Sequence, residues 1–243
     1  MTTSETSMPL LEMRNITAGY GKSEVLHGVS LRVERGEIVT MVGANGAGKT
    51  TTLRSIFGFT TLSSGSIWYR GQEITNWRAH KIVGLGLAYV PQDNKVFPSL
   101  TVRENLEMGG FSLPASESKT NRERVLDLFP RLRERIGQKA RTLSGGERQM
   151  PAVARGLMTN PEMLVLDEPS LGLAPQLVAS VFEQIQNVHD MGVTVFVVEQ
   201  NAQRALEVAH RVYILEFGQI RGEGSGQELL ADDEVRKAYL GEG

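Results

Sequence analysis

Apolar residues follow two patterns along this chain, and each pattern predicts a different kind of strand. Apolar and polar residues alternate in residues 11–16 and 29–33, which is typical of strands with one exposed face. Other runs are apolar almost throughout and are typical of parallel strands buried on both faces. These runs are residues 38–42, 87–90, 163–166 and 193–198. The patterns predict an α/β protein with a mostly parallel core sheet, flanking helices and an antiparallel β-layer near the N-terminus.

Shorter signals predict the remaining elements. Ser64 and Gly65 are expected to break the chain ahead of a strand. Further strands are expected at residues 66–69, 211–216 and 219–222, and helices at 51–57, at 175–190 and near 239–240.

Between residues 93 and 160 the pattern changes to helical periodicity with many charges. Thr101 and Glu104 have the spacing of a capping box and predict the start of a helix. We expect this segment to be a helical subdomain inserted into a single domain of residues 9–243, which follows a disordered polar tail of residues 1–8. Basic residues between 131 and 141 have no interleaved aromatic residues, so they are interpreted as a solvated face rather than a phosphate-binding patch.

Composition excludes several classes of protein. The chain has 243 residues, 40% of them hydrophobic, and can bury a sizeable core. It has no cysteine, so disulfides and thiolate metal sites are impossible. A net charge of −2 gives no electrostatic reason to expect nucleic acid as a partner. The longest apolar run is far shorter than the roughly 20 residues that span a bilayer, and the N-terminus has no signal-peptide pattern.

Residues 43–50 fit the pattern G-x-x-x-x-G-K-[ST] between an apolar strand and a predicted helix, the context that this pattern requires. The glycines let backbone N–H groups converge on a phosphate, and the helix N-terminus adds partial positive charge. Lys49 is expected to reach the β- and γ-phosphates, and the Thr50 hydroxyl is expected to hold Mg²⁺. The alternative is a loop that is merely flexible. The predicted ATP ligands are Gly43, Ala44, Asn45, Gly46, Ala47, Gly48, Lys49, Thr50 and Thr51.

Two acids end the apolar run at residues 163–168. Ligands of open α/β sheets lie at the carboxyl ends of the strands, so Asp167 is predicted to hold Mg²⁺ opposite Thr50. Glu168, the next residue, is expected to project in a different direction from Asp167. It is predicted to orient or deprotonate the attacking water. The alternative is a pair of acids that merely end a strand. Tyr20 offers a flat face for adenine, or it closes a turn.

A second glycine pair follows Leu143. Ser144 and Glu147 have capping-box spacing, and Gly145 and Gly146 would leave the first helical N–H groups bare. This segment is either a routine helix cap or a second anion site.

The order of these motifs resembles the nucleotide-binding subunit of an ABC transporter. The phosphate loop is followed by Gln92 after a strand, then by residues 143–147, then by the acid pair. The motif at 143–147 distinguishes this family from other phosphate-loop proteins. Within the family, residues 96–102, 169–175, 198–201 and 238–241 look most like the ATPase of branched-chain amino acid importers.

The resemblance implies a MgATP-hydrolysing dimer, in which Leu143 to Glu147 of one copy cover the γ-phosphate held by the other. Gln92 would contact Mg²⁺ and the attacking water, and Gln200 would read the γ-phosphate where most relatives have histidine. The implied partners are membrane permease subunits, docked near residues 97–104, a second ATPase subunit, and indirectly a periplasmic or extracellular solute-binding protein. The implied location is the cytoplasmic face of the plasma membrane, without nucleic acid. Urea uptake, lipid export, a soluble ATPase acting on nucleic acid and a scaffold without hydrolysis remain alternatives.

The chain departs from the family at several positions. Pro151 stands where the family usually has leucine, and Gly156 stands where it has alanine. Proline removes a helical N–H, here the partner of the Glu147 carbonyl, so we predict that this helix is bent or shortened. Residues 93–95 also differ from those of close relatives.

Overall fold

A six-stranded sheet forms the centre of the molecule, with strand order β10-β9-β3-β8-β7-β6. The computed structural model describes residues 8–92, 96–144 and 149–240. All neighbouring pairs in this sheet are parallel except β9 with β10. The strands are β3 (Ile38–Val42), β6 (Leu87–Val90), β7 (Met163–Asp167), β8 (Thr194–Glu199), β9 (Arg211–Glu216) and β10 (Gln219–Gly224). Every residue of β3, β7 and β8 is buried, as the apolar runs predicted.

A second, antiparallel sheet has the order β2-β1-β4-β5. Its strands are β1 (Leu11–Tyr20), β2 (Ser23–Val33), β4 (Thr61–Tyr69) and β5 (Gln72–Glu73). The chain break predicted at Ser64 and Gly65 is wrong, because β4 runs through both residues. Gly65 has φ +92° and passes so close to β1 that a Cβ there would lie 2.5 Å from the carbonyl oxygens of Arg14 and Asn15. The register between β1 and β4 shifts at this point, so the glycine permits a bulge rather than ending a strand.

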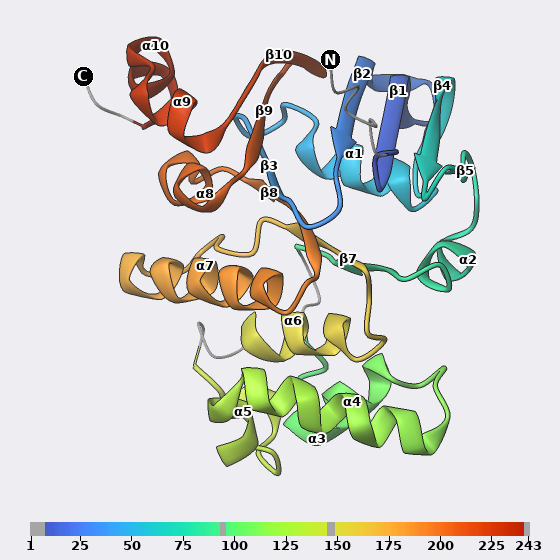
Figure 1. The fold of residues 1–243 in the computed structure, drawn as a ribbon, viewed down its shortest axis with the longest axis vertical. Coiled ribbons are helices and arrows are strands. Elements are labelled where there is room, and N and C mark those ends of the chain that lie inside the picture. Colours follow the sequence, from blue (N-terminus) through green and yellow to red (C-terminus); the bar gives the residue numbers. More distant parts are fainter. Residues whose placement is uncertain (1–7, 93–95, 145–148, 241–243) are drawn as a thin grey trace, which may run out of the picture.

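The two faces of the central sheet pack against different layers. Alternate residues point to opposite faces; Val39 and Met41 of β3 join the core beneath the antiparallel sheet, while Ile38 and Val42 join the core beneath the helices. Helix α1 lies between the sheets and contacts strands of both (Figure 1). The helices outside the 93–160 segment are α1 (Lys49–Ile56), α2 (Ala79–Val83), α7 (Pro175–Asp190), α8 (Ala202–Val208), α9 (Gly226–Ala231), α10 (Asp233–Val235) and the terminal turn Arg236–Leu240.

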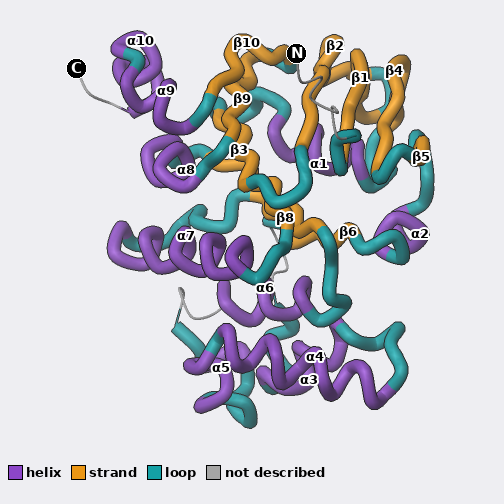
Figure 2. The backbone as a smooth tube through the Cα atoms, in the orientation of Figure 1, coloured by secondary structure: helices purple, strands orange, loops and turns teal. Residues whose placement is uncertain are grey.

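The predicted helical segment lies at one end of the molecule, where Figure 2 shows helices and loops but no strands. Thr101 and Glu104 form the predicted capping box, with both reciprocal hydrogen bonds present at the start of α3. The independence of this segment as a subdomain stays a prediction. Its elements are α3 (Val102–Gly109), α4 (Ala115–Leu128), α5 (Pro130–Glu134), the turn Ala140–Thr142 and α6 (Gln149–Leu157).

Helix α6 continues through both unusual residues. At Gly156 an added Cβ would be 3.1 Å from side-chain atoms of Leu164 and Val90, a tight contact for which those side chains would have to shift slightly. Pro151 lies within the helix, and Glu147 is outside the described residues. The bend or shortening of this helix therefore stays a prediction. Among the helices that the structure describes, none combines the length and apolar character needed to cross a membrane.

Candidate functional site

The phosphate loop connects β3 to α1 at the carboxyl end of β3. At Gly43 the chain passes the β9–β10 hairpin so closely that a Cβ would lie 2.3 Å from the Leu215 carbonyl oxygen. Gly48 has φ +112° and is the N-cap of α1. Glycine is therefore required at both positions, for space at the first and for conformation at the second. The N–H of Gly218 donates to the Ala47 carbonyl at 2.8 Å and fixes the loop against the hairpin.

Lys49 is buried at the base of this loop. Its Nζ donates to the carbonyl oxygens of Gly43 at 2.9 Å and Ala44 at 3.2 Å. It also lies 3.1 Å from Oε1 of Glu168, and the two residues are only 4% and 5% exposed. The structure thus joins the predicted phosphate-binding cation to the predicted water-positioning acid. Buried ion pairs of this kind are strongly coupled, because removing either partner leaves an uncompensated charge.

Asp167 contacts Thr50 and also Tyr89, a residue that sequence analysis did not single out. The Thr50 hydroxyl donates to Oδ1 of Asp167 at 2.9 Å, and the Tyr89 hydroxyl donates to Oδ2 at 2.9 Å. Burial raises the pKa of Asp167, and the two hydrogen bonds oppose that shift. Burial and the neighbouring Asp167 also raise the pKa of Tyr89. A hydroxyl and a carboxylate oxygen in contact are hard donors of the kind that Mg²⁺ prefers, so the residues present fit that ion.

Glu168 follows β7 in a left-handed backbone conformation, with φ +44°. Successive strand residues normally point to opposite faces; this conformation interrupts the alternation, and both acids of the pair contact the phosphate-loop region. Left-handed conformations of non-glycine residues cost about 1–3 kcal/mol and cluster at functional sites. The N–H of Glu168 donates to the Val198 carbonyl at 2.9 Å and holds this conformation.

The two predicted glutamines, Gln92 and Gln200, have different contacts in the structure. Nε2 of Gln92 donates to Oε2 of Glu168 at 2.9 Å, so Gln92 joins the cluster. The Gln200 side chain is exposed, and its backbone N–H donates to the carboxylate of Glu199 at 3.2 Å. Glu199 is buried, and sequence analysis gave it no role beyond its place in residues 198–201.

The remaining predicted ATP ligands lie around the loop. Ala44, Asn45 and Gly46 are exposed along its outer edge, and Thr51 is buried in the first turn of α1. Tyr20 is partly exposed at the end of β1, and its hydroxyl accepts a hydrogen bond from Arg54 of α1 at 3.4 Å. Adenine stacking on this ring stays a prediction.

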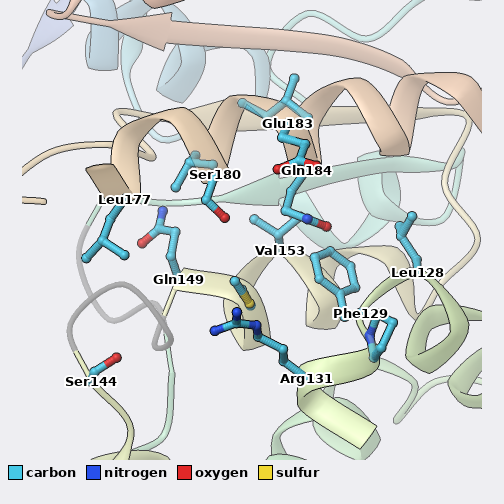
Figure 3. Close-up of a pocket in the computed structure, with 14 residues that line it drawn as sticks. Leu128, Phe129, Arg131, Ser144, Gln149, Val153, Leu177, Ser180, Glu183 and Gln184 are labelled. Atoms are coloured by element: carbon cyan, nitrogen blue, oxygen red, sulfur yellow. The ribbon is translucent and has the colours of Figure 1, made fainter. Parts of the chain in front are cut away.

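The predicted trans-acting motif is only partly described. Leu143 is buried and Ser144 is exposed, while Gly145, Gly146 and Glu147 lie outside the described residues. Ser144 lies at the edge of a cavity of about 550 Å³ between α5, α6 and α7 (Figure 3). None of the phosphate-loop or acid-pair residues is among the described residues that line this cavity. The loop geometry therefore defines the nucleotide site, and this cavity is separate from it.

Comparisons with known proteins show the family to which this chain belongs. The family model described as ABC transporter matches residues 26–171. The high-affinity branched-chain amino acid transport ATP-binding protein BraG of Pseudomonas aeruginosa is 48% identical over 232 residues, which cover 96% of this chain and 100% of BraG. The probable branched-chain amino acid transport ATP-binding protein LivF of Archaeoglobus fulgidus is 40% identical over 233 residues, covering 96% of this chain and 99% of LivF. The lipopolysaccharide export system ATP-binding protein LptB of Escherichia coli K12 is 35% identical over 241 residues, covering 97% of this chain and 98% of LptB.

Solved structures give the same result for the fold. An ATP-binding cassette of an ABC transporter in its ADP conformation has a TM-score of 0.85 at 29% identity, covering 97% of this chain and 100% of that one. A nucleotide-free cassette has a TM-score of 0.82 at 30% identity, with the same coverage.

Fold and site together define an α/β phosphate-loop ATPase with an added antiparallel sheet and a helical segment. The chain belongs to the ABC transporter family, in which it is an ATP-binding, ATP-hydrolysing subunit. The family resemblance and the fold class predicted from the sequence are confirmed.

Tyr89 allows a test of the predicted magnesium site. Replacing Tyr89 with phenylalanine keeps the ring, which stacks on Phe57 with centroids 5.0 Å apart, and removes only the hydroxyl that orients Asp167. Loss of such supporting bonds typically costs 10–100-fold in metal affinity. We expect the Mg²⁺ concentration for half-maximal ATP turnover to rise roughly tenfold. Tyr69→Phe removes a buried hydroxyl outside this cluster and is the control; equal Mg²⁺ dependence of the two variants would contradict the assignment.

Proposed function

We propose that this protein is the MgATP-hydrolysing subunit of an ABC importer that takes up branched-chain amino acids. The observation that carries the proposal is 48% identity to BraG over the whole of that protein, in a chain that joins the phosphate loop to the Asp167–Glu168 pair. We further propose that the protein works at the cytoplasmic face of the membrane, bound to permease subunits and to a second ATPase subunit. A solute-binding protein outside the membrane would act on it only indirectly.

In this proposal, ATP binding releases the acid that hydrolysis needs. Lys49 pairs with Glu168 at 3.1 Å, and the γ-phosphate of incoming ATP competes for the same ammonium group. Glu168 then keeps its hydrogen bond from Gln92 at 2.9 Å, which leaves a carboxylate oriented but no longer neutralised. Such a carboxylate can orient a water molecule and accept its proton as the water attacks phosphorus.

Thr50 and Asp167 are the residues that would hold Mg²⁺. When bound, this ion neutralises charge on the β- and γ-phosphates. Gln200 is proposed to contact the γ-phosphate through its exposed side chain. Glutamine can donate a hydrogen bond there but cannot carry a proton. Ser144, Gly145 and Gly146 are proposed to complete the site of the partner subunit.

Exposed apolar side chains on the helical segment support a permease contact. Phe97, Met108 and Phe111 are exposed there despite their size. Asn105 of α3 ties the loop to the helix, because its Oδ1 accepts from the Phe97 N–H at 2.8 Å and its Nδ2 donates to the Phe97 carbonyl at 3.1 Å. Arg155 lies against the Phe97 ring, with the guanidinium carbon 4.9 Å from the centroid. We propose that a cytoplasmic helix of the permease packs against this part of the helical segment, beginning at Phe97.

Uptake by the intact complex tests the proposal. The tagged protein would be purified with its bound permease subunits, reconstituted into liposomes with the solute-binding protein, and assayed with labelled leucine, isoleucine, valine and urea. We expect ATP-dependent uptake of the branched-chain amino acids and ATPase stimulation by the loaded binding protein. The identity to LptB makes lipid export a second candidate; a complex that extracts lipopolysaccharide, or one that takes up urea alone, would contradict the proposal.

A further inference from the structure

Glu199 is a buried carboxylate with no ion-pair partner among the described residues. It ends β8 with only 1% of its surface exposed. Its partners are instead backbone N–H groups: the Ser170 N–H donates to Oε1 at 2.8 Å, and the Gln200 N–H donates to Oε2 at 3.2 Å. Burying a charge costs free energy unless it is compensated, so this carboxylate is retained at a cost that a neutral side chain of similar size would avoid.

The two oxygens of Glu199 hold two different segments of the site. Oε1 holds the turn that follows Glu168, in which the Leu171 N–H donates back to the Glu168 carbonyl at 3.2 Å. Oε2 holds the first residue after β8, which is Gln200. Burial raises the pKa of Glu199, whereas hydrogen bonds from Ser170 and from the Asn201 N–H favour its charged form. Glu199 therefore links the backbone that follows Glu168 to the backbone of Gln200. Both of these residues are predicted to act in catalysis.

We infer that Glu199 is a positioning residue for ATP hydrolysis: it anchors Gln200 to the turn after Glu168, so that the two groups face the γ-phosphate in a fixed relation. The inference rests on the proposed roles of Glu168 and Gln200. Glu199 is buried and acts through the backbone, so it affects the orientation of the catalytic groups and not the affinity for nucleotide. Small displacements of catalytic groups by distant changes can cost about 100-fold in rate.

Glu199→Gln is the first test, because glutamine has the same shape but carries a donor NH₂ where Oε1 or Oε2 accepts an N–H. We expect kcat for ATP to fall by about 10- to 100-fold, with KM for ATP and the dissociation constant for ADP within about twofold of the wild-type values. Glu207→Gln on α8 removes an exposed carboxylate and is the matched control, expected to leave kcat unchanged. Wild-type kcat in Glu199→Gln would overturn the inference, as would a loss confined to nucleotide affinity.

A double-mutant cycle with Gln200→Ala separates positioning from simple destabilisation. If Glu199 acts through Gln200, adding Glu199→Gln to Gln200→Ala lowers kcat by no more than about twofold. If the two losses multiply, the inference is wrong. Should Glu199→Gln fail to fold, the same cycle is run with Glu199→Asp, which keeps the charge but shortens the reach. An inactive wild-type protein would refute the proposed function, whereas activity that depends on Glu168 but not on Glu199 would refute only this inference.

Discussion

Glu168→Gln is expected to lower ATP turnover by about 100- to 10,000-fold, the range that a general base contributes. Glutamine cannot accept a proton from the attacking water. The same change is expected to strengthen ATP binding, because it removes the carboxylate that lies 3.1 Å from Lys49 and would face the γ-phosphate. ATP should therefore hold two copies, or one copy and its sister subunit, in a stable dimer. Phosphate release measures the first effect, and gel filtration with and without ATP measures the second.

Glu134→Gln is the control for this variant, because Glu134 is an exposed carboxylate on α5, far along the chain from the acid pair. It should leave both turnover and dimerisation unchanged. Turnover of Glu168→Gln close to that of the wild type would remove Glu168 from the role of base. A variant that is inactive but stays monomeric in saturating ATP would instead contradict the predicted head-to-tail use of Ser144, Gly145 and Gly146.

Sequence analysis predicted the parts of this site that are encoded locally. The phosphate loop and the acid pair lie at the ends of apolar runs, so a pattern of a few residues gives both their chemistry and their position. The structure brings Thr50 to Asp167, as predicted, and also Lys49 to Glu168. These residues lie at or after the carboxyl ends of β3 and β7, which lie at the same edge of the sheet on either side of β8.

Tyr89 and Glu199 were missed because their roles depend on partners distant in sequence. The hydroxyl of Tyr89 reaches Asp167, 78 residues away, and the carboxylate of Glu199 reaches Ser170, 29 residues away. Each residue belongs to an apolar strand, where a tyrosine or a terminal acid has an ordinary structural interpretation. Gly65 was misinterpreted for the same reason. A glycine that permits a bulge against Arg14 has the same local sequence as one that ends a strand.

The coupling of Lys49 to Glu168 gives a second large effect, on stability as well as on function. Lys49→Ala is expected to reduce ATP affinity by at least about 100-fold, because the loop loses its only predicted phosphate-binding cation. It also leaves Glu168 buried without its ion-pair partner, for which losses of about 3–5 kcal/mol are typical. In a protein of this size, that loss corresponds to a melting temperature lower by roughly 10 °C.

The double variant Lys49→Ala, Glu168→Gln tests whether the ion pair causes this loss. With the acid neutralised, no unpaired charge remains, so we expect most of the melting temperature to return while ATP binding stays weak. Differential scanning calorimetry without nucleotide measures the first quantity, and titration with ATP measures the second. If the double variant is no more stable than Lys49→Ala alone, the loss comes from packing around the lysine stem. Glu168 would then not be the group that competes with ATP for Lys49.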